Sequence, residues 1–219
     1  MLFRSVAHAA NGCLINGLTP WEHTMEQIRA AGKLSNGETV PDLETFIDAA
    51  LDGGSTRLWL DVKNITINGS STEAGREASA RACERACEII VGKGAQKFCE
   101  FIVTGTGTAI SSTSPTTIWK RCLAAAKVAG IKAGWMSFSA PATYASNGYG
   151  WLNSTTENFY YNGQLINRNG YSIESYTNLG IEVSVYNADS DADMNYYLGY
   201  KSKLSAICTN YPAKLISKW

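Results

Sequence analysis

The sequence predicts an α/β domain with parallel strands, because short apolar runs alternate along it with stretches of helical periodicity. The predicted strands are residues 57–63, 98–103, 133–138, 181–186 and 204–208. A chain of 219 residues can bury a sizeable core, and no internal repeat or linker divides it, so residues 1–219 are expected to form a single domain. The alternation fits two architectures, a closed (β/α) barrel or an open doubly wound sheet.

Composition and charge argue against several classes of partner. Apolar residues make up 45% of the chain and charged residues 17%, as in an ordinary globular protein. The 19 basic and 19 acidic residues cancel, so no nucleic acid is expected as a partner, since binding one needs a basic face. No apolar stretch is long enough for a membrane span, and no signal peptide is recognised. The compartment stays open: periplasmic or secreted for a mature or truncated form, otherwise cytoplasmic.

The N-terminal part of the chain contains few segments that are predicted to form strands. One strand is expected near residues 4–8 and at most a second near residues 13–16. Further on, Ser70 and Glu73 have the spacing of a capping box, which predicts the start of a long helix. The apolar stripe of this helix is predicted to consist of Ala80, Cys83, Cys87, Ile90 and Val91.

The second half continues the alternation with one long interruption. A loop rich in Gly, Thr and Ser covers residues 104–114, and Pro115 is expected to open the next helix. Residues 140–169 are aromatic and polar without a clear period, so they are expected to form an elaborated loop of the kind that often carries function. Later helices are expected at residues 172–179, at 191–200 and after Pro212.

The cysteines and the glycosylation sequons are interpreted as structural or neutral features. Cys83 and Cys87 are four residues apart and share one helix face, a spacing that suits two metal ligands, yet no CxxC pair or neighbouring His completes a zinc set. They are expected to fill the core as small apolar thiols. Sequons begin at Asn64, Asn68 and Asn153, and they have meaning only in a eukaryotic secretory setting.

Four segments together resemble the glycerophosphodiester phosphodiesterase family. Residues 34–46, LSNGETVPDLETF, look like the family's NGE-x-IPTLEEFL stretch, and residues 58–63, LWLDVK, resemble its strand L-x-IEIK. Residues 183–189, VSVYNAD, continue to Met194 and match V-N-V-W-T-V-N…M, while residues 209–212, TNYP, fall where the family has TDYP. Their order and spacing over most of the chain make the resemblance fairly specific, and it implies a TIM-type (β/α) barrel.

The N-terminal part departs from the family pattern. Family members have a first strand that ends in His-Arg-Gly, a second that carries Glu-x-Asp and a third that ends in His-Asp. Residues 6–9, VAHA, align best with the third strand, so that His8 keeps a family histidine and Ala9 replaces the aspartate. Aligned with the first strand instead, they would leave strands two and three missing. Either alignment implies an incomplete barrel that lacks about two N-terminal strands.

The resemblance also implies a set of site residues. In the family, two histidines do the acid–base work, and carboxylates bind a divalent cation, Ca²⁺ or Mg²⁺. His8 and Lys63 are therefore the candidate catalytic residues, and Asp61, where the family has Glu, is the candidate metal ligand. The alternative for Asp61 is a structural ion pair with Lys63, which lies two residues on along the same strand face. Glu100 is a second, weaker candidate for a metal ligand. Residues 104–108 resemble a phosphate-binding glycine loop only in their glycines, because the lysine of such a loop is absent.

Three functions remain open at this point. The implied phosphoric diester hydrolase activity is expected to be weak or lost, because the Glu-x-Asp pair and one histidine are missing. An inactive relative could instead bind a small phosphodiester or polyol ligand through the aromatic residues of the 140–169 segment. These are Tyr144, Tyr149, Trp151, Phe159, Tyr160 and Tyr161. A third function is self-association, because an incomplete barrel exposes strand edges that a homodimer would cover.

Overall fold

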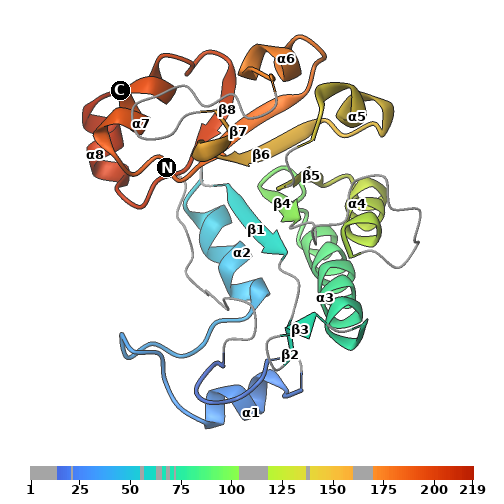
Figure 1. Ribbon diagram of the computed structural model, residues 1–219. Coiled ribbons are helices and arrows are strands. Elements are labelled where there is room, and N and C mark those ends of the chain that lie inside the picture. The colour runs from blue at the N-terminus through green and yellow to red at the C-terminus, as the bar shows by residue number, and fades with distance from the viewer. Residues whose placement is uncertain are drawn as a thin grey trace. The chain divides into compact units, whose positions relative to one another are not determined.

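Six strands form the main sheet, in the order β1-β4-β5-β6-β7-β8 (Figure 1). They are β1 (Leu58–Val62), β4 (Cys99–Val103), β5 (Lys132–Trp135), β6 (Trp151–Thr155), β7 (Glu182–Tyr186) and β8 (Leu204–Ile207). The computed structural model describes residues 14–20, 22–54, 57–62, 66–67, 70–71, 73–103, 118–136, 139–159 and 170–219. β1 pairs with β4, and β5 to β8 pair in succession, all in parallel, so the predicted α/β class and all five predicted strands are confirmed.

The sixth strand, β6, lies where the sequence predicts an irregular loop. α5 (Pro141–Ser146), β6 and the 3₁₀ turn η1 (Thr156–Asn158) occupy this segment. The loop prediction for residues 140–169 is therefore wrong for residues 141–158, and residues 160–169 lie outside the described residues. β6 has no continuous apolar run, because two of its central residues, Asn153 and Ser154, are polar. Both are buried, on opposite faces of the strand. The Ser184 hydroxyl donates to the Asn153 side-chain oxygen, and the Asn158 side-chain amide donates to the Ser154 hydroxyl, so each of these buried side chains has a hydrogen-bond partner.

The first of two compact units comprises residues 1–104 and 113–133. Its described helices are α1 (Met25–Ala30), α2 (Leu43–Asp52), α3 (Glu73–Gly92) and α4 (Ile118–Ala129). β2 (Thr66–Ile67) and β3 (Ser70–Ser71) form a separate antiparallel pair. α3 and α4 lie side by side next to β4, which is buried along its whole length (Figure 1). This burial on both faces is typical of a parallel strand covered by crossover helices.

The segment that resembles the family's NGE stretch has a structural role in this unit. Gly37 has a φ of +83°, a left-handed conformation that glycine adopts without strain, and it lies in a tight turn. Asp42 then caps α2 by accepting a hydrogen bond from the Thr45 amide at 2.9 Å, and Arg29 donates to its other oxygen at 2.9 Å. The hydrogen bonds to this carboxylate, that from the Thr45 hydroxyl foremost, lower the pKa of Asp42 to about 2.

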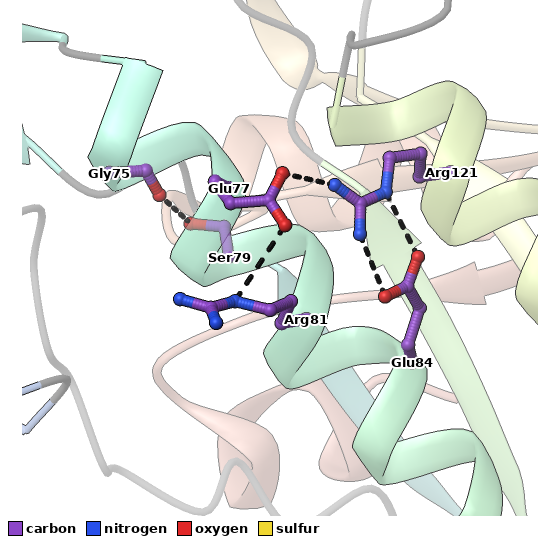
Figure 2. Close-up of polar contacts among 6 residues, drawn as sticks. All are labelled: Gly75, Glu77, Ser79, Arg81, Glu84 and Arg121. Carbon is purple, nitrogen blue, oxygen red and sulfur yellow. Dashed lines mark hydrogen bonds and ion pairs between the residues drawn. The ribbon is translucent and has the colours of Figure 1, made fainter.

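An ion-pair network joins α3 to α4 on the surface (Figure 2). The Arg121 guanidinium donates to both carboxylate oxygens of Glu84, at 2.9 and 2.8 Å, and also to Glu77. These hydrogen bonds raise the pKa of Arg121 further above its usual value. Arg81 lies 3.7 Å from the other oxygen of Glu77 and is largely exposed. The planar, bidentate Arg121–Glu84 pair is the geometry in which a surface ion pair contributes most.

Beneath this network, buried thiols fill the space between the same helices. The Cys83 thiol hydrogen-bonds with the Cys122 thiol, and this contact, together with burial, raises the pKa of Cys83 far above its usual range. Burial also raises the pKa of Cys87 to about 12 and that of Cys99 on β4 to about 11. All four are free and buried, and a thiol held protonated in an apolar environment is unreactive, which agrees with the core role expected from the sequence.

Three local predictions in this unit are wrong. Ser70 pairs with Ile67 in the β2–β3 hairpin and does not cap α3. Val91 is 45% exposed, because its position falls off the buried stripe that Ala80, Cys83, Cys87 and Ile90 form. Residues 14–16 do not form a strand of the sheet, since Ile15 makes only an isolated bridge across a tight turn.

The second compact unit comprises residues 105–112 and 134–219, and an aromatic core holds it together. Its further helices are α6 (Ile173–Thr177), α7 (Asp191–Leu198) and α8 (Pro212–Ser217). Trp135, Tyr144 and Tyr176 form adjacent ring pairs, with centroids 5.8 Å apart for Trp135–Tyr144 and 5.9 Å for Tyr144–Tyr176. The Tyr176 hydroxyl donates to the Ser139 carbonyl at 2.6 Å. Burial raises the pKa of Tyr144 and Tyr176, so both phenols stay neutral.

Most of the aromatic residues that the sequence suggested as a ligand-binding loop belong to this core. Tyr144, Trp151 and Phe159 are fully or almost fully buried, and Tyr149 packs against them. That prediction is therefore wrong for these residues, because they hold β6 and α5 in the core, and Tyr160 and Tyr161 lie outside the described residues. The sequon at Asn153 is not a glycan site in this fold, since its side chain is 4% exposed. Asn64 and Asn68 also lie outside the described residues.

Candidate functional site

In a parallel (β/α) fold, the carboxyl ends of the strands form the usual site of chemistry. Asp61 lies at this end of β1, as the sequence predicted, and it is exposed. The two predicted catalytic residues, His8 and Lys63, lie outside the described residues, so their proximity to Asp61 stays a prediction. His23 is a half-buried residue near α1, where its Nδ1 lies 2.9 Å from the Thr19 carbonyl oxygen.

The described surroundings of Asp61 do not make a resident metal site. A hard cation such as Ca²⁺ or Mg²⁺ takes about six or more oxygen ligands, several of them carboxylates in a tight site. Within the described ranges, no group of three or more His, Cys, Asp or Glu side chains is arranged to hold a metal ion. One exposed carboxylate is a weak partner for such an ion.

Glu100 is fully engaged in a structural cluster on the first unit's sheet. Its side chain is buried, and its Oε1 accepts a hydrogen bond from Arg57 at 2.8 Å, while Oε2 accepts one from the Trp59 indole at 2.7 Å. The Lys132 ammonium lies 3.8 Å from Oε1. Both oxygens and the charge are thus compensated within the fold, so Glu100 is a structural residue and not a cation ligand.

A second polar cluster joins the segments after β7 and β8. The Asp189 carboxylate accepts hydrogen bonds from the Asn210 amide N–H at 2.7 Å, the Asn210 side chain at 2.7 Å and the Thr209 hydroxyl at 3.1 Å. In the family pattern quoted above, position 189 is Asn and position 210 is Asp. In this chain the two residue types are exchanged relative to that pattern, and their side chains are in contact.

The third polar feature is a chain of three buried residues on β6 and β7. The Trp151 indole N–H donates to the Ser184 hydroxyl at 2.9 Å, and this hydroxyl donates to Asn153 Oδ1 at 2.7 Å. Their neighbours Leu152 and Val183 belong to the aromatic core on the helix-covered face, so the chain lies on the opposite face of the sheet.

Gly134 on β5 makes room for this chain. A Cβ at this position would lie 2.4 Å from the Trp151 ring, far inside van der Waals contact. The sequence analysis did not predict this hydrogen-bond chain. The signal that indicates it is the two-residue spacing of Trp151, Asn153 and Thr155, which places them on one face of a strand.

Comparison with known proteins relates the fold, but not the sequence, to phosphodiesterases. No protein-family model matches the chain, and no curated protein matches it. A glycerophosphodiester phosphodiesterase from Parabacteroides distasonis matches with a TM-score of 0.64 and 15% identity, over 89% of this chain and 69% of its own. A Silicibacter pomeroyi protein described as a putative glycerophosphoryl diester phosphodiesterase matches with a TM-score of 0.53 and 13% identity, over 82% of this chain and 56% of its own. The Vibrio cholerae LapD S helix-GGDEF-EAL protein, bound to c-di-GMP, matches with a TM-score of 0.50 and 12% identity, over 73% of this chain and 38% of its own.

These likenesses define the fold class. At 12 to 15% identity they show the fold alone, and the fold is a TIM-type (β/α) barrel that is incomplete. Among the described residues the main sheet has six strands, two fewer than the eight strands of a closed barrel. None of the described helices has the length and apolar character of a membrane span.

Proposed function

We propose that this chain is a glycerophosphodiester phosphodiesterase-like phosphoric diester hydrolase in which hydrolysis is weak or lost. The observation that carries the proposal is the exposed Asp61 at the carboxyl end of β1, in a fold shared with solved proteins of that name. The sequence resemblance in segments 34–46, 58–63, 183–189 and 209–212 supports it. The substrate class is a small phosphodiester with a polyol part, such as a glycerophosphodiester.

The weakness of the activity follows from the residues that would be needed. Cation-assisted hydrolysis requires several carboxylates around Ca²⁺ or Mg²⁺ and an acid–base pair beside the phosphorus. In the sequence, the Glu-x-Asp pair and one of the two histidines are missing, and Glu100 is held in an ion-pair cluster. The loss of a ligand set and of an acid–base group each costs about a hundredfold or more.

The test is a hydrolysis assay on glycerophosphocholine with Mg²⁺, with Ca²⁺ and with a chelator. Turnover is expected well below the range of about 1–10³ s⁻¹ that is usual for enzymes, and Asp61→Asn is expected to remove what remains. Asp52→Asn, at the exposed end of α2, is the matched control and should leave the rate unchanged. A cation-dependent turnover within the usual range, or residual activity unaffected by Asp61→Asn, would contradict the proposal.

A second candidate function is self-association as a homodimer of an inactive relative. The strand order leaves β1 and β8 as the two ends of the sheet among the described residues, and unpaired strand edges favour association. Two-fold symmetry is the commonest way in which two copies cover the same edge. Sedimentation at micromolar concentration is expected to show a dimer, and a single species of 23.7 kDa would exclude this function.

A further inference from the structure

The hydrogen-bond chain on β6 and β7 has a fixed direction. An indole N–H can only donate, so the Ser184 oxygen must accept from Trp151, and the Ser184 hydroxyl proton must go elsewhere. In the structure the acceptor is Asn153 Oδ1, 2.7 Å away, so the oxygen of the Asn153 amide is the atom turned toward Ser184. The amide nitrogen therefore faces away from Ser184 and carries two N–H donors.

The Asn153 nitrogen is left open by the protein itself. The Asn153 side chain is 4% exposed and Ser184 is 0% exposed, yet among the described residues Nδ2 takes part in no hydrogen bond. Nδ2 is also not among the fully buried side-chain atoms without a partner in the described part of the chain, so solvent reaches it. An amide that buried neighbours hold in one direction, with two donors turned to solvent, has the character of a ligand-binding group, because a ligand can replace the water without any cost of ordering the side chain.

The surroundings select an uncharged partner. The register places Thr155 beside Tyr186, one layer nearer the carboxyl ends of the strands, on the same face as Asn153 and Ser184. On this face of the described strands β6, β7 and β8 there is no lysine or arginine, and the one charged side chain is Glu182, which lies beside Trp151 and would repel an anion. A phosphate group would therefore find no opposite charge, whereas hydroxyl groups match a surface of amide and hydroxyl side chains.

We infer that Asn153 is a binding residue for a polyol, in which its two Nδ2 hydrogens donate to hydroxyl oxygens of a glycerol-like group. Ser184 and Trp151 are positioning residues, since they hold the amide in the orientation that presents these donors. The inference rests on the proposed function in taking the polyol to be the glycerol part of a phosphodiester. Binding of the polyol does not depend on hydrolysis, so the two can fail separately.

The experiment follows the side-chain amide signals of ¹⁵N-labelled protein by NMR during titrations with glycerol and with inorganic phosphate. Glycerol is expected to shift the Asn153 Nδ2 signals, and phosphate at the same concentration is not. Asn153→Asp should weaken glycerol binding about tenfold, since a carboxylate cannot donate. Asn195→Asp, the same change on exposed α7, should leave binding unaltered.

Two further readouts separate binding from folding. Trp151→Phe removes the indole donor and lets the Asn153 amide turn toward Ser184, so its Nδ2 signals should move before any ligand is added, and the glycerol response should shrink. If Asn153→Asp does not fold, the wild-type signals, assigned through the backbone, still decide the question. Unmoved Asn153 signals on addition of glycerol, a response to phosphate alone, or equal glycerol affinity in Asn153→Asp would each overturn the inference, whether or not hydrolysis is found.

Discussion

The exchanged Asp189–Asn210 pair gives a quantitative test of the fold assignment. Asn210→Asp would put two carboxylates in the place of a 2.7 Å charge-assisted hydrogen bond. Two like charges at about 4 Å repel by roughly 1 kcal/mol in water and roughly 4 kcal/mol near a protein surface. Asp189 is half-buried and Asn210 exposed, so the lower part of this range applies, and the variant is expected to lose about 2 kcal/mol of unfolding free energy at pH 7.

The reverse change should be milder, and the double change should restore the pair. Asp189→Asn keeps an acceptor for the Asn210 amide N–H and the Thr209 hydroxyl but loses the charge, which should cost about 1 kcal/mol. Asp189→Asn combined with Asn210→Asp recreates the charge-assisted contact with its partners exchanged. Its stability should therefore return to within about 0.5 kcal/mol of the original chain, giving a coupling free energy of about 2.5 kcal/mol.

Urea denaturation of the four proteins measures these values, with Asn195→Asp as a control for adding one surface carboxylate. The deficit of Asn210→Asp should also shrink at acidic pH, because one of its two facing carboxylates takes up a proton. Simple additivity, with the double variant about 3 kcal/mol less stable, would refute the reasoning that Asp189 and Asn210 form one coupled contact that tolerates exchange of its charge.

Three other changes test the structure. Asp42→Ala should cost about 1 kcal/mol at pH 7. Since the pKa of Asp42 is lowered to about 2, chiefly by Thr45, its stabilisation is present above pH 4 and lost between about pH 4 and 2, and pH-dependent denaturation of the variant should lack that loss. Arg121→Met should lower the unfolding free energy by about 1 kcal/mol while the control Arg81→Met changes it by less than about 0.5, and equal effects would contradict the bidentate network. Gly134→Ala should cost about 1–3 kcal/mol by thermal denaturation, because the new methyl meets an indole ring at 2.4 Å, and an unchanged melting temperature would show that the ring is not there.

The sequence by itself determined the features that depend on residues close together in the chain. The strands that are rich in apolar residues, such as β4 and β7, follow from the buried side chains that they carry, and the cap of α2 follows from Asp42 three residues before Thr45. The position of Asp61 at the end of a strand follows in the same way. These patterns arise from local backbone geometry and from burial of one face, both of which are written in the order of the residues.

Only the tertiary structure decided where the polar side chains find their partners. Three hydrogen-bonded pairs show this. Asn153 and Ser184 are separated by 31 residues in the chain, Asp189 and Asn210 by 21 residues, and Glu100 and Arg57 by 43 residues. β6 was missed because its buried polar residues look like loop residues until those distant partners are known. Burying a polar group is costly unless a partner satisfies it, and in these three cases the partner comes from another strand or loop, so periodicity along the chain could not reveal it.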